Sequence, residues 1–76
     1  MKELLLYIAR SLVDNPDEVT VSEREENGET VLELRVAEGD MGKVIGRQGR
    51  IAKEIRALVK SLAQRSGKRV SVEIVD

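Results

Sequence analysis

Several side chains that carry much of protein chemistry are missing from this sequence of 76 residues. It has no cysteine and no histidine. Their absence excludes disulfides, thiol nucleophiles, most zinc sites and the usual proton carrier at neutral pH. We therefore expect a protein that is not an enzyme, holds no metal and needs no cofactor.

Aromatic residues are almost missing as well. Phenylalanine and tryptophan are absent, and Tyr7 is the only aromatic residue. RNA-binding folds such as the RRM and the cold-shock domain stack bases on several aromatic side chains. The composition argues against both of these folds, although it leaves an aliphatic binding surface open.

Long hydrophobic runs are also missing. No apolar run approaches the roughly 20 residues that span a bilayer, and the start of the chain lacks the length and cleavage site of a signal peptide. We expect a cytoplasmic protein with no membrane contact. Because 41% of the residues are hydrophobic and 36% are charged, the sequence predicts one small globular domain, residues 1–76.

Charge is present but unevenly distributed. The net charge is −1, yet residues 1–41 contain 4 basic and 11 acidic side chains, whereas residues 42–69 contain 9 basic and 1 acidic. Such a concentration of positive charge attracts polyanions even when the whole protein is weakly acidic. The alternative is that these cations only solvate one helix face.

The basic segment 42–69 opens with a glycine-rich turn, in which Gly46 and Gly49 bracket two polar residues and a long helical pattern begins at Arg50. Glycines let the main chain turn sharply and approach a ligand. The first turn of a helix presents N–H groups and the positive end of its dipole to a phosphate. Nearby aliphatic side chains can form a floor for bases. The candidate nucleic-acid-binding residues are Lys43, Val44, Ile45, Gly46, Arg47, Gln48, Gly49, Arg50, Ile51 and Lys53.

Hydrophobic periodicity predicts the remaining elements. A helix over 2–13 ends before Pro16, and two antiparallel strands flank an Asn27–Gly28 hairpin turn. One helical turn over 41–45, capped by Asp40, precedes the glycines, and the long helix ends at Ser66-Gly67-Lys68, before a strand over 70–75. This order predicts an α+β fold with helices on one face of a three-stranded sheet. The expected helical core residues are Leu5, Ile8, Ala9, Leu12, Ile51, Ile55, Leu58, Val59 and Leu62.

Two kinds of catalytic site are disfavoured by residue spacing. Nothing makes the hairpin glutamates converge as an acid–base pair or a Mg²⁺ site, so we expect them on a solvated face. The turn also differs from a nucleotide-binding P-loop, since Arg50 rather than a Lys–Ser/Thr pair follows Gly49. The glutamates in question are Glu23, Glu25, Glu26, Glu29 and Glu33.

The segment Val44-Ile45-Gly46-Arg47-Gln48-Gly49-Arg50-Ile51 resembles the I-G-x-x-G-x-x-I signature of KH domains, whose G-x-x-G loop clamps single-stranded nucleic acid by its backbone. The resemblance extends along the chain to the small single-KH proteins of bacteria, the KhpA-like group. It implies a type II KH fold with the order α-β-β-α-α-β, in which only the tight turn at Asn27-Gly28 stands where other members have a variable loop. The other matching segments are Lys2-Glu3-Leu4-Leu5, Asp14-Asn15-Pro16, Asp40-Met41-Gly42-Lys43 and Val70 to Asp76.

The resemblance implies a non-catalytic protein that binds single-stranded RNA and acts as a post-transcriptional regulator or RNA chaperone, with links to cell elongation and division. It also implies pairing, as a homodimer or with a second KH-domain protein. We expect the interface on helix 2–13 or a sheet edge, because the cations of 42–69 repel their own copies.

An alternative function is that of a KH-shaped protein adaptor with weak or no RNA binding. It would work through Leu6, Tyr7 and Val13, which fall off the main stripe of the first helix. The same three residues could instead cover the sheet edge.

Overall fold

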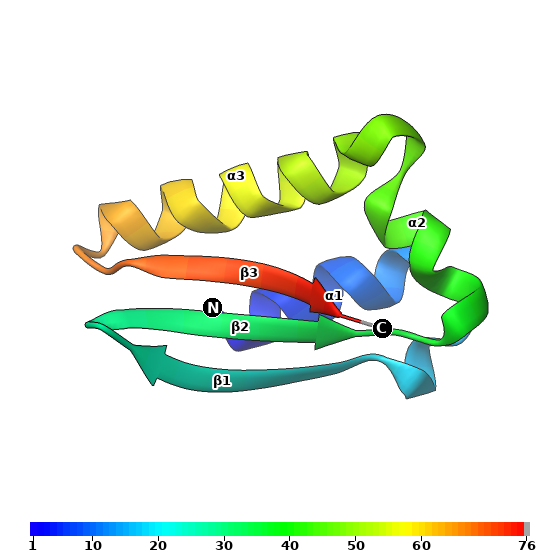
Figure 1. Ribbon diagram of the computed structural model, residues 1–76, viewed down its shortest axis with the longest axis horizontal. Coiled ribbons are helices and arrows are strands. Elements are labelled where there is room, and N and C mark those ends of the chain that lie inside the picture. The colour runs from blue at the N-terminus through cyan, green and yellow to red at the C-terminus, as the bar shows by residue number, and fades with distance from the viewer. Residues whose placement is uncertain (76) are drawn as a thin grey trace.

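The computed structural model describes residues 1–75, in which three helices lie on one face of a three-stranded sheet (Figure 1). This is the predicted element order. Three single 3₁₀ turns join the predicted elements, at Pro16–Glu18, Glu38–Asp40 and Arg47–Gly49. Asp76, part of the predicted C-terminal segment, lies outside the described residues. The elements are α1 (Lys2–Leu12), β1 (Thr20–Glu26), β2 (Glu29–Arg35), α2 (Met41–Ile45), α3 (Arg50–Arg65) and β3 (Val70–Val75).

Strand β2 is the centre of the sheet, antiparallel to β1 and parallel to β3. The β1–β2 connection is the predicted two-residue hairpin, with positive φ at Asn27 (54°) and Gly28 (78°), as a type I′ turn requires. Parallel strands need a long crossover connection. Here α2, the glycine turn and α3 make that crossover, so the turn lies beyond the carboxyl end of β2 (Figure 1).

In α1 the core-facing side follows the predicted stripe at Leu5, Ile8 and Ala9 but not at Leu12. Leu5 and Ala9 are buried, but Leu12 is 38% exposed. Leu6 and Val13, which were predicted to lie off the stripe, pack against the core instead. The helix contacts β1 and α2, and this tertiary packing decides that Leu6 and Val13 are covered and that Leu12 is not.

Helix α3 contacts the sheet through small and β-branched residues, namely Ala52, Ile55, Val59 and Ala63. Leu58 was predicted to be in the core, but 46% of its surface is exposed. It lies one residue before Val59, and each residue turns a helix by about 100°, which carries Leu58 to the side of α3. Among the described residues, no helix is both long and apolar enough to cross a membrane.

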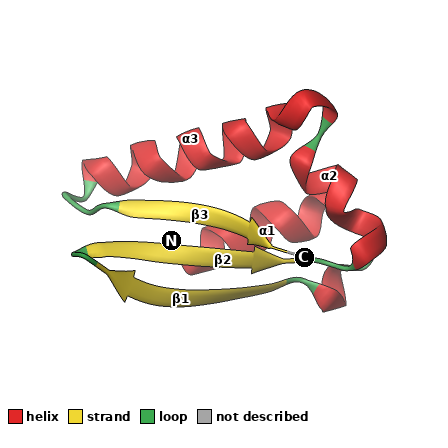
Figure 2. Ribbon diagram, viewed as in Figure 1, coloured by secondary structure: helices red, strands yellow, loops and turns green. Residues whose placement is uncertain are grey.

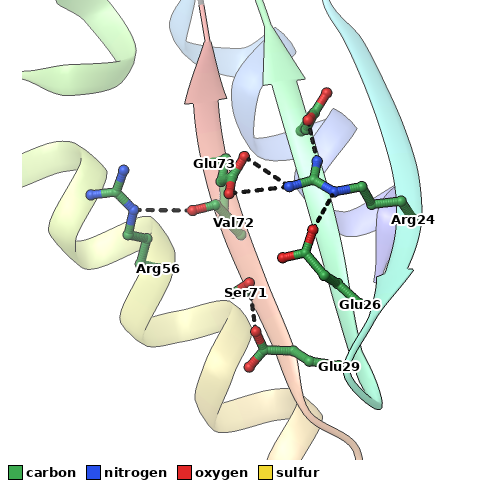
Figure 3. A network of polar contacts seen from close by, with 8 residues as sticks. Arg24, Glu26, Glu29, Arg56, Ser71, Val72 and Glu73 are labelled. Atoms are coloured by element: carbon green, nitrogen blue, oxygen red, sulfur yellow. Dashed lines mark hydrogen bonds and ion pairs between the residues drawn. The ribbon is translucent and has the colours of Figure 1, made fainter.

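The uncovered face of the sheet is held together by Arg24 of β1. Its Nε lies 3.3 Å from Glu26 and its Nη2 lies 3.3 Å from Glu73, and Nη1 also contacts Glu33 (Figure 3). The hydrogen bond to Glu26 is the largest cause of a raised Arg24 pKa, and the charges of Glu73 and Glu33 act in the same direction. The prediction of a solvated face holds for Glu26, whose side chain is 57% exposed, while the side chain of Glu33 is 27% exposed; the pairing of both with Arg24 was not predicted.

Candidate nucleic-acid interface

Residues 38–45 and 50–65 are helical and residues 47–49 form a 3₁₀ turn in which Gln48 departs from helical backbone; Gly46 lies in the short break between helical segments that Figure 2 shows. Gly46 has φ 76° and ψ 176°, a combination that is nearly restricted to glycine. A Cβ atom at this position would lie 2.6 Å from Cγ1 of Ile51. Gly46 is therefore required both by the backbone conformation and by the close packing of the turn against α3.

The second half of the turn is open. Gln48 (φ 57°) and Gly49 (φ 73°) both adopt left-handed conformations, and a Cβ atom at Gly49 would meet no atom within 4 Å. Helix α3 starts at Arg50 without a side-chain hydrogen bond to its first turn from any described residue. The positive end of the helix dipole is therefore accessible beside Gly49.

Four exposed cations surround this opening, at Lys43, Arg47, Arg50 and Lys53. Lys43 forms an ion pair, with its Nζ 3.3 Å from an Asp14 carboxylate oxygen. Within residues 1–75 the other three have no ion pair. Among the described residues their positive charge has no ion-pair partner, so it is available to a polyanion.

The apolar surface beside the turn is smaller than predicted. Val44 was a candidate floor for bases, but its side chain is fully buried in the core, because α2 turns this residue toward the sheet. Ile45 is 36% exposed. Ile51 is half-buried and packs against the core. Of the three aliphatic candidates, Ile45 and part of Ile51 remain accessible to a ligand.

The turn and the fold agree with the comparisons with known proteins. Residues 2–74 match the family described as KhpA/KhpB, KH domain. The chain belongs to this family.

Three curated relatives carry the name RNA-binding protein KhpA. The relative from Clostridium acetobutylicum is 60% identical over 75 residues, 99% of this chain and 100% of that protein. The one from Caldanaerobacter subterraneus subsp. tengcongensis is 56% identical with the same coverage, and the one from Chlamydia trachomatis is 47% identical over 100% of this chain and 97% of that protein.

A solved structure is also similar in fold. The crystal structure of Aquifex aeolicus Era bound to GDP and AlF₄⁻ aligns with a TM-score of 0.66 and 24% sequence identity. The alignment covers 96% of this KH domain and 28% of the Era chain. At this level of identity the similarity concerns the fold alone.

Asp40 fixes the start of α2, the helix that precedes the KH turn (residues 46–49). It was predicted to cap α2, but its carboxylate makes no cap bond there and is 1% exposed. It accepts hydrogen bonds from the backbone N–H of Asp14 (3.2 Å) and Asn15 (3.0 Å) and from Asn15 Nδ2 (3.2 Å). These bonds join the end of α1 to the start of α2.

The same contacts set the protonation state of Asp40. Burial alone would raise the pKa of this carboxyl group, but the three hydrogen bonds and the charge of Lys43 outweigh burial. The pKa of Asp40 therefore lies below its ordinary value of 3.8. Asp40 is ionised at neutral pH and keeps all three donors.

Arg56 is a residue near the KH turn that was not among the candidates. Its Nε donates a hydrogen bond to the carbonyl oxygen of Val72, 3.2 Å away, on the edge strand β3 (Figure 3). The spacing of Lys53, Arg56 and Lys60, at i, i+3 and i+7, places the three cations on one side of α3. From the sequence, this spacing could have predicted that the basic surface continues from the turn along α3, beside the edge of β3.

Proposed function

We propose that this KH domain binds single-stranded RNA, without catalysis, along residues 46–49 and the first turn of α3. The observation that carries the proposal is the coincidence of an open positive-φ turn with three cations that form no ion pair within residues 1–75. Phosphates lie along the α3 amides, Arg47, Arg50 and Lys53, and unpaired bases turn toward Ile45 and Ile51. Lys43 and Gln48 border the same track, whereas Val44 supports it from the core.

The proposed chemistry suits a broad cellular role. Contacts to phosphate and sugar position a strand but carry little sequence information, and the accessible apolar surface beside the turn is small. We therefore infer that the protein acts in the cytoplasm on many transcripts, as a post-transcriptional regulator or RNA chaperone. The relatives' name, RNA-binding protein KhpA, supports the binding part of this proposal.

Substitution of Gly49 provides the test, because Asp and Asn both tolerate left-handed backbone better than other side chains do. Gly49→Asp places a carboxylate in the open space beside the cations, and Gly49→Asn is the uncharged control of the same size. We expect Gly49→Asp to bind a fluorescent oligouridylate at least about tenfold more weakly than Gly49→Asn, a difference of ~1.4 kcal/mol. Affinities within about twofold of each other, with unchanged circular dichroism, would contradict the proposal.

We also propose that the domain works as a dimer, either with itself or with a second KH-domain protein. A chain of this size buries little core, and two linked binding sites can raise avidity by roughly 10² or more. Tyr7 on α1 is 72% exposed and Leu58 on α3 is 46% exposed, whereas Leu6 and Val13 are engaged by the core. Tyr7 is therefore the most exposed hydrophobic candidate for assembly or for the adaptor alternative, and Leu58 is a second candidate that lies in the basic segment 42–69, which the interface was expected to avoid.

Sedimentation of Tyr7→Glu and Leu58→Glu tests this assembly. We expect at least one of the two variants to weaken both self-association and RNA avidity while binding of a short oligonucleotide to the monomer is kept. A wild-type protein that stays monomeric at high micromolar concentration, without a second KH protein, would contradict a homodimer.

A further inference from the structure

A second basic site lies at the far end of α3 from the KH turn. A cavity of about 290 Å³ is lined there by Glu29, Lys60, Gln64, Lys68, Arg69 and Val70. Three of these six residues are cations, and the one carboxylate, Glu29, already accepts a hydrogen bond from Ser71 Oγ at 3.3 Å. The cavity is thus a positively charged hollow of a size that admits a phosphate group.

The cations are positioned by the backbone around this cavity. The α3 helix ends in a Schellman motif, in which Lys68 N–H donates to Ala63 O (2.9 Å) and Gly67 N–H donates to Gln64 O (3.0 Å), with Gly67 at φ 71°. The carbonyl of Arg69 then accepts the N–H of Thr30 at 2.9 Å. Lys68 and Arg69 are therefore held beside Lys60 without help from side-chain ion pairs.

Glu29 is the one carboxylate that lines this cavity, and it leaves the three cations in excess. Lys60, Lys68 and Arg69 form no ion pair within residues 1–75. A larger neighbouring cavity of about 460 Å³ shares Lys68 and Arg69 but is also lined by Glu23 and Glu25, whose carboxylates repel an anion. An anionic group therefore favours the Lys60 side.

We propose that this cavity binds a backbone phosphate of the same RNA strand that occupies the KH turn, as a second anchor point; this inference rests on the proposed function. Helix α3 has 16 residues, so the two sites lie about 24 Å apart. A G-x-x-G loop holds about four nucleotides, and only a longer strand reaches the second site. On this side of α3, Lys53 belongs to the first site and Lys60 to the second, and Arg56 lies between them.

The test distinguishes phosphate contacts in this cavity from the effect of the protein's overall charge on RNA binding. The double variant Lys60→Gln/Lys68→Gln removes two cavity cations, and Arg10→Gln/Arg65→Gln removes the same net charge from residues that do not line the cavity. The probes are fluorescent oligouridylates of four and about 12 nucleotides, since only the longer one exceeds the length of the loop site. The measurement is the slope of log K against log[salt].

For the longer probe we expect the slope to shrink by about 1.4 in the cavity variant, since each contact on a single strand contributes about 0.7. The four-nucleotide slope and both slopes of the control variant stay unchanged. An unchanged slope for the longer probe, or an equal decrease in the control, overturns the second anchor. If Gly49→Asp still weakens both probes, the proposed function survives that failure; if it weakens neither, both proposals fall.

Discussion

The uncovered face of the sheet and the KH turn differ in whether their basic side chains are paired with carboxylates. On the sheet, Arg24 contacts three carboxylates, on Glu26, Glu33 and Glu73 (Figure 3). At the turn, Arg47, Arg50 and Lys53 have no carboxylate partner among the described residues. A basic side chain thus links neighbouring strands where carboxylates neutralise its charge. It is available to a ligand where no carboxylate neutralises it.

The two regions also differ in what fixes their shape. The strands of the sheet are joined by backbone pairing, with the ion pairs of Arg24 added on the uncovered face, whereas the turn depends on positive φ at Gly46, Gln48 and Gly49. The buried carboxylate of Asp40 also accepts hydrogen bonds from the backbone N–H groups of Asp14 and Asn15, which join the end of α1 to the start of α2. Changes to charge and changes to backbone should therefore have different consequences in the two regions.

The largest effect is expected from Gly46→Ala. The new Cβ would lie 2.6 Å from Ile51 Cγ1, and the backbone is in a region that costs a non-glycine residue about 1–3 kcal/mol. With overpacking added, urea denaturation should show a loss of about 2–4 kcal/mol in the free energy of unfolding, a large fraction of the stability of a small domain.

Gly42→Ala is the matched control for that change. Gly42 lies inside α2, and a Cβ there would meet nothing within 4 Å. Alanine in place of glycine within a helix should raise stability by about 0.5–1 kcal/mol. If Gly46→Ala and Gly42→Ala changed the free energy of unfolding in the same direction, the turn would not depend on the backbone conformation of Gly46.

Much of this difference could be predicted from the sequence. The Gly46–Gly49 spacing before a helical period predicted the position of the turn. The uneven distribution of charge predicted that the surface around the turn is positive. Both signals come from residues that are neighbours in the sequence. The strand, strand, helix, helix, strand order after the first helix likewise followed from local periodicity and the Asn27–Gly28 signal.

Other features depend on contacts between distant residues and could not be predicted. The partners of Asp40 lie 25 and 26 residues away along the chain, so the local pattern indicated a helix cap instead. Leu58 fits the apolar stripe of α3, but its exposure depends on how the helix is rotated on the sheet. Arg24 reaches Glu73 only because β1 and β3 flank the same central strand.

A reciprocal pair of substitutions tests the contrast in charge directly. Arg47→Gln should reduce the salt slope of RNA binding by about 0.7 and leave stability within about 0.5 kcal/mol of wild type. Arg24→Gln leaves three carboxylates close together without their cation, so it should lower the melting temperature and leave the salt slope unchanged. A loss of RNA binding in Arg24→Gln with a retained fold would remove the distinction between the two regions.

A pH titration tests how Asp40 supports the turn. Because the pKa of Asp40 is lowered in the folded protein, its ionised form contributes stability that is fully present above the unfolded value of about 3.8 and is lost as pH falls through the lower folded value. The free energy difference between wild type and Asp40→Asn should therefore be constant near neutral pH and shrink on acidification. The exposed Asp17→Asn is the control, and a difference that stayed constant to about pH 2 would contradict the assignment.

The smallest effect is expected at Gln48, the non-glycine residue of the turn with positive φ. A left-handed conformation costs such a residue about 1–2 kcal/mol, so Gln48→Gly relieves strain in the folded state. Glycine also gives the unfolded chain more freedom, which offsets about 0.4–1 kcal/mol of that gain. We expect a net change in unfolding free energy of at most about 1 kcal/mol, with RNA affinity kept because Arg47, Arg50 and Lys53 are untouched.

Gln48→Val introduces a β-branched residue that resists this conformation, so it should lose more than about 1 kcal/mol of unfolding free energy. Equal stabilities for the glycine and valine variants would show that the turn does not require the left-handed backbone at this position.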